Sequence, residues 1–159
     1  FDVKFISFDD MKKDKNLQWL ATTKGAIKRI LEIDSTIKGN SSLQLPDILV
    51  LLYILNGMDY DNKIKLPTQK EIGEEIGLTA RRISMAITKL KKLSFIAKLP
   101  EAKTYYINPF YFYIGDYRDL NSKYKTWKKL APKDQYSNNE ELDNETDSFI
   151  DFAETAEKQ

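Results

Sequence analysis

Apolar residues recur at helical spacing along much of the 159-residue chain, and breaker residues separate the helical stretches. Residues 17–37 show this spacing, and the Gly-Asn-Ser-Ser sequence at 39–42 follows as a loop. A strongly apolar helix is predicted from 45 to about 56, with Gly57 as its C-terminal stop. Residues 3–8 are instead rich in β-forming residues and predict a strand.

The clearest local pattern follows Pro67, where two short helices are separated by a glycine-containing turn. Thr68 and Glu71 match the T-x-x-E capping box, in which each side chain satisfies a backbone N–H at a helix start. The first helix ends at Gly77, and Thr79 is a good N-cap for the second. The residues that the second helix turns inward are Ile83, Ile87, Leu90 and Leu93. This arrangement is a helix-turn-helix pattern.

Short β segments stand before and after this helix pair. A strand is predicted at 64–66, and strands at about 95–99 and 104–107 enclose a turn at 100–103. Together with the helix at 45–56, the order is helix, strand, helix, helix and hairpin. The predicted fold class is therefore α+β, mainly α: a winged helix-turn-helix with an N-terminal strand and helix extension and a C-terminal helix.

This pattern divides the chain into four parts. An N-terminal extension covers 1–44, the winged-helix domain 45–115, a basic amphipathic helix 116–132 and an acidic tail 133–159. Asp116 is the candidate cap of the C-terminal helix. The predicted apolar face of that helix consists of Tyr117, Leu120, Tyr124, Trp127 and Leu130, and its polar face of Arg118, Lys123, Lys125, Lys128 and Lys129.

Composition removes most catalytic chemistry, because the chain contains no histidine and no cysteine. It therefore lacks the nucleophile pairs of serine and cysteine hydrolases, the usual zinc sites and any disulfide. The Asp59-Tyr60-Asp61 sequence beside Asn62 is interpreted as a turn rather than a metal site, and no P-loop occurs. We expect no enzyme activity, no metal and no cofactor.

Charge is segregated along the chain, although the net charge is only +1. Residues 1–132 carry a net charge of +8, and residues 133–159 carry −7. A basic body with an acidic appendage is typical of a protein that binds a polyanion such as nucleic acid. Coding that favours lysine, asparagine and isoleucine is an alternative explanation, and charge alone leaves the two open.

The sequence shows neither a membrane anchor nor a secretory signal. The longest apolar run, 48–55, is far shorter than the roughly 20 residues that cross a bilayer. The start of the chain lacks a basic region followed by an apolar one. A cytoplasmic protein without a membrane partner is the expectation.

The second helix of the helix-turn-helix offers candidate residues for reading DNA. In this fold that helix lies in the major groove, where each base pair displays a distinct pattern of donors and acceptors. Arginine suits O6 and N7 of guanine, and apolar side chains contact the thymine methyl. The candidate base-reading residues are Ala80, Arg81, Arg82, Ser84 and Met85. The alternative is that the two arginines cover an exposed helix face and pair with Glu74 or Glu75.

Contacts to DNA phosphates are predicted from hydroxyl and lysine side chains around this helix. The candidates are Thr68, Thr79, Thr88 and Lys89 on the helices, and Lys65, Lys98 and Lys103 on the strands and the wing. Plain solvent exposure of the last three is an equally good alternative. The aromatic run from 105 to 117 would stack unpaired bases or pack in the core, and its scarcity of basic residues favours packing.

Four segments carry a family resemblance: 49–53 (LVLLY), 58–62 (MDYDN), 69–78 (QKEIGEEIGL) and 105–109 (YYINP). Over roughly residues 1–115, the chain resembles the RepL-type plasmid replication and maintenance proteins of low-GC Gram-positive bacteria. The resemblance implies a bacterial winged-helix protein that binds plasmid DNA at or near a replication origin, or at its own promoter. Family members often carry basic residues at the positions of Ala80 and Met85, so a target sequence does not carry over.

Rolling-circle nicking initiators resemble one another in a paired-histidine metal site beside a tyrosine, which this chain cannot build. The leading hypothesis is therefore a homodimeric, sequence-specific double-stranded-DNA-binding protein that acts in plasmid replication or maintenance by origin binding without nicking. A winged-helix transcriptional repressor and a protein-binding winged-helix scaffold are the alternatives. The acidic tail is either inert, or docks host replication proteins, or competes with DNA for the basic face.

Overall fold

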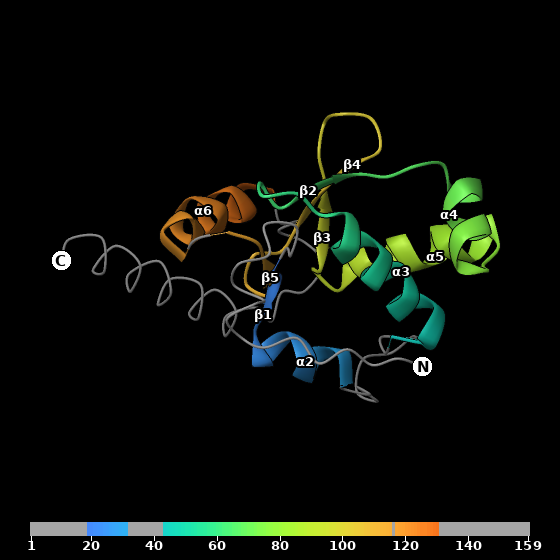
Figure 1. Ribbon diagram of the computed structural model, residues 1–159, viewed down its shortest axis with the longest axis horizontal. Coiled ribbons are helices and arrows are strands. Elements are labelled where there is room, and N and C mark those ends of the chain that lie inside the picture. The colour runs from blue at the N-terminus through green and yellow to red at the C-terminus, as the bar shows by residue number, and fades with distance from the viewer. Residues whose placement is uncertain (1–18, 32–42, 116, 131–159) are drawn as a thin grey trace, which may run out of the picture.

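The computed structural model describes residues 19–31, 43–115 and 117–130. These parts of the chain contain five α-helices and two small antiparallel sheets, so the fold is α+β and mainly helical, as predicted (Figure 1). Four sequence predictions lie outside the described residues: the strand at 3–8, the loop at 39–42, the Asp116 cap and the tail 133–159.

The described elements in chain order are β1 (Ala21–Thr22), α2 (Lys24–Leu31), α3 (Leu45–Gly57), β2 (Lys63–Lys65), α4 (Gln69–Ile76), α5 (Ala80–Lys92), β3 (Ile96–Lys98), β4 (Thr104–Ile107), β5 (Phe112–Tyr113), a 3-10 turn (Tyr117–Asp119) and α6 (Leu120–Leu130). The predicted order of helix, strand, helix, helix and hairpin is therefore present, starting at α3. In Figure 1, α4 and α5 lie at one end of the molecule and α6 at the other, with strands β2, β3 and β4 between them.

Strands β2, β4 and β3 form a three-stranded antiparallel sheet in that spatial order. The register places Ile64 of β2 opposite Tyr105 of β4. The Leu99 backbone N–H donates to the Thr104 carbonyl at 2.9 Å and closes the turn between β3 and β4. The loop of this hairpin extends away from the rest of the sheet (Figure 1).

Helices α4 and α5 meet at a tight corner. Gly77 ends α4 in a left-handed conformation with φ of 73°, which glycine adopts without steric cost. A Cβ at Gly73 would stand 2.2 Å from the Leu78 carbonyl oxygen, so only glycine fits at this close approach. Thr79 caps α5, because its hydroxyl accepts a hydrogen bond from the Arg82 backbone N–H at 3.2 Å. The glycine stop and the second cap are both as predicted.

One hydrophobic core includes residues of α3, α4, α5 and the sheet. The predicted inward stripe of α5 is buried, with Ile83 and Leu90 at 0% exposure. Other members of the same core are Val50, Ile54, Ile72, Phe95 and Ile107. Burial of the stripe sets the rotation of α5 about its own axis, and this rotation decides which of its side chains point outward.

The N-terminal helix begins later than its sequence spacing predicts, and the part predicted from 32 to 37 lies outside the described residues. Residues 21–22 form strand β1, which pairs with β5, and α2 begins only at Lys24. Thr23 sets this boundary, because its hydroxyl accepts from the Ala26 N–H at 3.2 Å and donates to the Phe110 carbonyl at 2.8 Å. Strand β1 thereby joins the N-terminal segment to the segment that follows the β3–β4 hairpin.

The aromatic run after the hairpin packs in the core, which the sequence analysis favoured over base stacking. Phe110, Tyr111 and Phe112 are all buried. The Phe110 ring stacks on Tyr124 of α6 with centroids 4.0 Å apart, and Tyr111 meets Phe95 at 5.2 Å. Ring pairs at these separations add to the burial of apolar area. The aromatic run therefore fastens α6 to the rest of the fold.

Lys123 departs from the predicted pattern of α6. The sequence assigns it to the polar face, yet it is only 9% exposed. Its ammonium donates to the Ile114 carbonyl at 2.6 Å and to Oδ1 of Asn62 at 3.1 Å. Burial lowers the pKa of Lys123, and the negative charge of Asp119 acts in the opposite direction. The predicted position of this lysine is wrong because two buried oxygen acceptors draw its ammonium inward.

Candidate nucleic-acid interface

The surface of α5 divides into three faces. One belongs to the core, and a second lies against α3. The third is exposed to solvent, and its residues recur at i, i+4, i+7 and i+11, which traces one line along a helix of 3.6 residues per turn. This exposed stripe consists of Arg81, Met85, Thr88 and Lys92. It carries two positive charges and no negative charge.

Arg82 lies outside the exposed stripe. Its guanidinium turns toward α3, where Nη1 lies 2.8 Å from Oδ1 of Asp47 and Nη2 lies 3.3 Å from Oε1 of Gln44. Lys89, two turns further along the same side of α5, reaches Oδ2 of Asp47 at 3.2 Å. The Asp47 side chain is fully buried, whereas those of Arg82 and Lys89 are 22% and 17% exposed. We call these four residues the Asp47 cluster.

Asp47 also closes the first turn of α3. The Gln44 backbone N–H donates to Oδ2 of Asp47 at 2.9 Å as part of a capping box. Burial alone would raise the pKa of this carboxyl, but hydrogen bonds from Arg82, the Gln44 backbone and Lys89 outweigh burial and lower the pKa. Asp47 is therefore ionised at neutral pH and holds two cations between α3 and α5.

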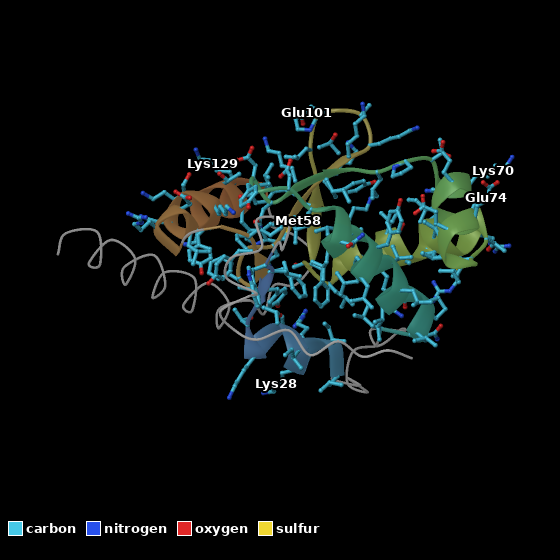
Figure 2. All side chains as sticks on the ribbon, in the orientation of Figure 1. Lys28, Met58, Lys70, Glu74, Glu101 and Lys129 are labelled. Atoms are coloured by element: carbon cyan, nitrogen blue, oxygen red, sulfur yellow. The ribbon has the colours of Figure 1, made fainter. Side chains whose placement is uncertain are left out.

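The Asp47 cluster revises the interpretation of two candidate residues. The sequence predicts base reading for Arg82 and phosphate contact for Lys89, and the structure gives both a partner inside the protein. The alternative partners in the sequence analysis were Glu74 and Glu75 of α4, and Figure 2 shows Glu74 on the outer side of that helix. The signal that sequence reasoning passed over is Asp47, an acidic residue in the first turn of an otherwise apolar helix.

Arg81 is the predicted base-reading arginine that stays exposed. Within the described residues it forms no ion pair. Ala80 beside it is exposed at the first turn of α5, Met85 is 55% exposed one turn later, and Ser84 is half-buried. The structure thus brings Ala80, Arg81 and Met85 together on one accessible surface and moves Ser84 to its edge.

Lys92 is a member of the exposed stripe that the sequence analysis missed. Among Lys89, Lys91 and Lys92, only Lys92 is exposed, and it lies on the same line as Arg81. The signal was present in the sequence, because residues 11 apart lie on one side of an α-helix. The sequence analysis chose Lys89 instead, and the structure places its ammonium 3.2 Å from Oδ2 of Asp47.

The threonines near the corner have hydrogen-bond partners within the protein. The Thr68 hydroxyl accepts from the Glu71 backbone N–H at 3.2 Å, and the Thr68 backbone N–H donates to Oε2 of Glu71 at 2.8 Å, which completes the predicted capping box. The hydroxyl also donates to the same oxygen at 2.9 Å. Thr79 caps α5, and Thr88 donates to the Ser84 carbonyl at 3.0 Å. Hydrogen bonds from Thr68 to the carboxylate lower the pKa of Glu71. Each hydroxyl therefore has a local structural role in addition to its predicted one at phosphate.

The three strand and hairpin lysines differ in how far their ammonium groups are engaged. Lys98 donates to the carbonyls of Leu99 and Glu101 at 2.5 and 2.6 Å, and it lies 5.6 Å from the centroid of the Tyr105 ring. This ammonium holds the hairpin turn together. Lys103 follows in the same turn, exposed and with φ of 56°, and Lys65 is exposed at the end of β2. Lys65 and Lys103 therefore present their charge to solvent.

In the described parts of the chain, no group of three or more acidic, histidine or cysteine residues is placed to hold a metal. Oδ1 of Asp59 instead accepts the backbone N–H groups of Asp61 and Lys63, both at 2.9 Å, which supports the interpretation of that sequence as a turn. None of the described helices is long and apolar enough to cross a membrane.

The chain was compared with protein-family models, with curated proteins and with solved structures. None of the three comparisons found a match. The indications of function are therefore the geometry of α5, the Asp47 cluster and the β3–β4 hairpin, together with the resemblance read from the sequence.

Proposed function

We propose that the segment from α3 to β4 is a winged helix-turn-helix that binds double-stranded DNA, with α5 as its recognition helix. The element order and the sheet order β2-β4-β3 support this proposal. In it, the β3–β4 hairpin is the wing. The net charge of +8 over residues 1–132 supplies the long-range attraction to a polyanion.

The exposed stripe is the observation that carries the proposal. The major groove admits one α-helix, and a recognition helix must offer it a face that the core does not use. Arg81, Met85 and Lys92 form such a face on α5. Arg81 at the N-terminal end is suited to O6 and N7 of guanine, Met85 to a thymine methyl, and Lys92 to a phosphate.

The other cations have supporting roles in this proposal. Arg82 and Lys89 hold α5 against α3 and thereby fix the angle at which the exposed stripe meets the groove. Lys65 and Lys103 contact phosphates beside the groove, and Lys98 keeps the wing in shape for that contact. Phosphate contacts set register and most of the affinity, while base contacts set specificity.

The biological role that we propose is plasmid replication or maintenance, as the RepL-type resemblance implies. Rolling-circle nicking initiators share a paired-histidine metal site. This chain has no histidine and cannot form such a site. We therefore propose that it binds an origin, as a homodimer, without cutting it. A test of this role is a plasmid copy-number assay, in which deletion of the gene abolishes replication if the protein is an initiator and preserves it if the protein is only a repressor.

Fluorescence anisotropy tests the DNA-binding proposal directly. The purified chain is first used to select a binding site from random duplexes, and its affinity is then measured at several salt concentrations. The Arg81→Ala/Lys92→Ala variant is expected to lose most of its preference for the selected site. The matched control is Lys70→Ala/Lys129→Ala, which removes two positive charges outside α5 (Figure 2). Unchanged site preference in the stripe variant would rule out α5 as the reading helix.

A further inference from the structure

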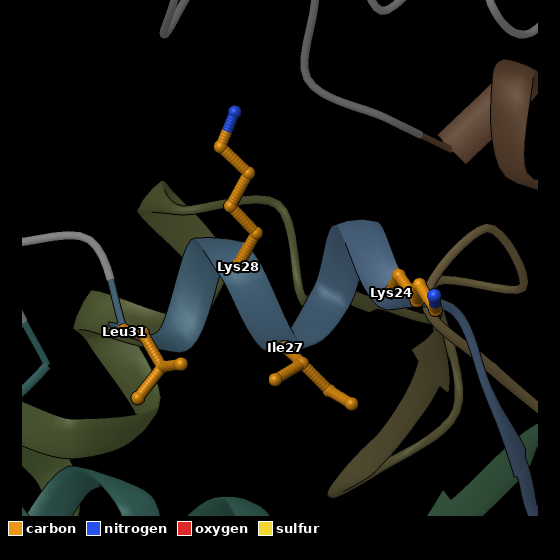
Figure 3. Close-up of a pocket in the computed structure, with 4 residues that line it drawn as sticks. All are labelled: Lys24, Ile27, Lys28 and Leu31. Atoms are coloured by element: carbon orange, nitrogen blue, oxygen red, sulfur yellow. The ribbon is translucent and has the colours of Figure 1, made fainter.

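The outer face of α2 contains an apolar groove. Its lining consists of Lys24, Ile27, Lys28 and Leu31, and its volume is about 410 Å³ (Figure 3). Helix α2 buries Ala26 on its other side, whereas Ile27 and Leu31 remain 47% and 73% exposed. Figure 3 shows these two side chains on one side of the helix. We call this surface the α2 groove.

Exposed apolar side chains are concentrated in this part of the chain. Of the eight large apolar residues that are exposed in the described chain, four fall between 19 and 31: Trp19, Leu20, Ile27 and Leu31. Apolar surface gathered in this way, with charged residues at its border, is typical of an interaction site. The border here is positive, because Lys24 and Lys28 both line the groove.

The same chain contains a segment with the complementary chemistry. Residues 147–157 hold four acidic residues and no basic residue, and the apolar side chains of Phe149, Ile150 and Phe152 lie among them. This segment follows α6 in the chain, so it is tethered to the folded part, and a tether raises its local concentration at a site on the same molecule. We propose that residues 147–157 bind in the α2 groove of their own chain.

Two other occupants fit the groove less well. A second copy that placed its own α2 groove here would bring lysines against lysines, and like charges in contact are unfavourable. The exposed stripe of α5 would attract the acidic segment as well, but Met85 is its one large apolar side chain. The α2 groove, in contrast, offers two large apolar side chains beside two lysines to a segment that carries both aromatic and acidic residues.

A spin-label experiment on the full chain, without DNA, tests this proposal. The chain has no cysteine, so Ser148→Cys gives one labelling site for a nitroxide. We expect the label to broaden the amide NMR signals of residues 24–31 at low salt. Lys24→Glu/Lys28→Glu, and separately Ile27→Gln/Leu31→Gln, are expected to remove most of that broadening. All four side chains are exposed, so neither variant opens the core.

The matched control is Lys125→Glu/Lys129→Glu, which reverses two exposed charges at the same spacing on α6. It is expected to leave the broadening of α2 unchanged. Broadening of α5 signals in place of α2 signals would overturn the proposal. A mixed sample of isotope-labelled chains without a spin label and spin-labelled chains without isotopes is a second test. If the α2 signals broaden to the same degree in this mixture, the contact is with a second copy and the proposal is overturned. Since no DNA is present, neither result bears on the proposed DNA binding.

Discussion

Arg81 and Arg82 are neighbours in sequence with opposite environments. Arg81 is exposed and points away from the fold, whereas Arg82 forms a 2.8 Å ion pair with the buried carboxylate of Asp47. The cause is geometric, since one residue along an α-helix is a rotation of about 100°. Arg81 therefore lies on the side of α5 opposite the core, and Arg82 lies on the side that faces α3.

The comparison separates two uses of positive charge on one helix. An exposed charge contributes little to folding stability and remains available to a ligand. A charge paired with a buried carboxylate contributes to the fit between two helices, and its loss leaves a buried group without a partner. The Asp47 cluster thus holds α5 in place against α3. The direction in which the exposed stripe faces depends on that placement.

Asp47→Ala is expected to have the largest effect. It removes the shared acceptor of Arg82 and Lys89 together with the cap of α3. Removing one partner of a buried ion pair costs about 3 kcal/mol or more of unfolding free energy, and we expect a loss of this size. Urea denaturation followed by circular dichroism measures it.

A control for that loss replaces the whole charged group. The triple variant Asp47→Leu/Arg82→Met/Lys89→Met leaves no unpaired charge between α3 and α5, and we expect it to recover much of the stability. If the triple variant is no more stable than Asp47→Ala, the contribution of Asp47 lies in the helix cap and not in the ion pairs.

Acid is expected to weaken the same cluster by a smaller amount, because protonation leaves the carboxyl group in place. The pKa of Asp47 is lowered from its ordinary value of 3.8 in the folded chain, so its contribution to stability is present above that value. The contribution is lost as pH falls through the lowered pKa. The measurement is the difference in unfolding free energy between wild type and Asp47→Asn from pH 7 to pH 2. A difference that stays constant over this range would contradict the assignment.

The two arginines are expected to show opposite phenotypes when each is changed to alanine. Arg81→Ala should leave thermal stability unchanged and weaken binding to the selected DNA site by about 1–3 kcal/mol. Arg82→Ala should lower stability, because Asp47 then keeps only Lys89 as a cation, and should change site preference less. Calorimetry and anisotropy on both variants decide the matter. Equal effects of the two variants in both assays would remove the distinction between the two faces of α5.

Much of the fold was predictable because its signals are local. The capping box of Thr68, the corner at Gly77 and the cap at Thr79 each act within a few residues, and the inward stripe of α5 follows from helical periodicity. The strands at 63–65, 96–98 and 104–107 lie close to where short β-forming segments predicted them, although their pairing into one sheet was not predicted. Local signals of this kind are readable without knowledge of tertiary contacts.

The parts that escaped prediction all depend on partners distant in sequence. Asp47 lies 35 positions before Arg82, and Lys123 lies 61 positions after Asn62. Helical periodicity assigns a lysine or arginine to the polar face, and it contains no information about a buried acceptor elsewhere in the chain. The short β1 strand escaped for the same reason, since its partner β5 lies 90 residues away. Long charged side chains bridge such gaps, so their environment is the least readable from sequence.

The smallest expected effect concerns the β3–β4 hairpin, the proposed wing, and extends the comparison to its two lysines. Lys103→Ala removes an exposed charge at a position where φ is 56°, and alanine is no more strained there than lysine. We expect a slight, uniform weakening of binding to all duplexes and a decrease of about one in the slope of log affinity against log salt.

Lys98→Ala should instead loosen the turn, because the Lys98 ammonium donates hydrogen bonds to the carbonyls of Leu99 and Glu101. Anisotropy at four salt concentrations, paired with amide hydrogen exchange in residues 99–104, separates a phosphate contact from a turn clamp. If Lys103→Ala alters site preference but leaves the slope of log affinity against log salt unchanged, Lys103 contacts bases, and the proposed phosphate contact is wrong.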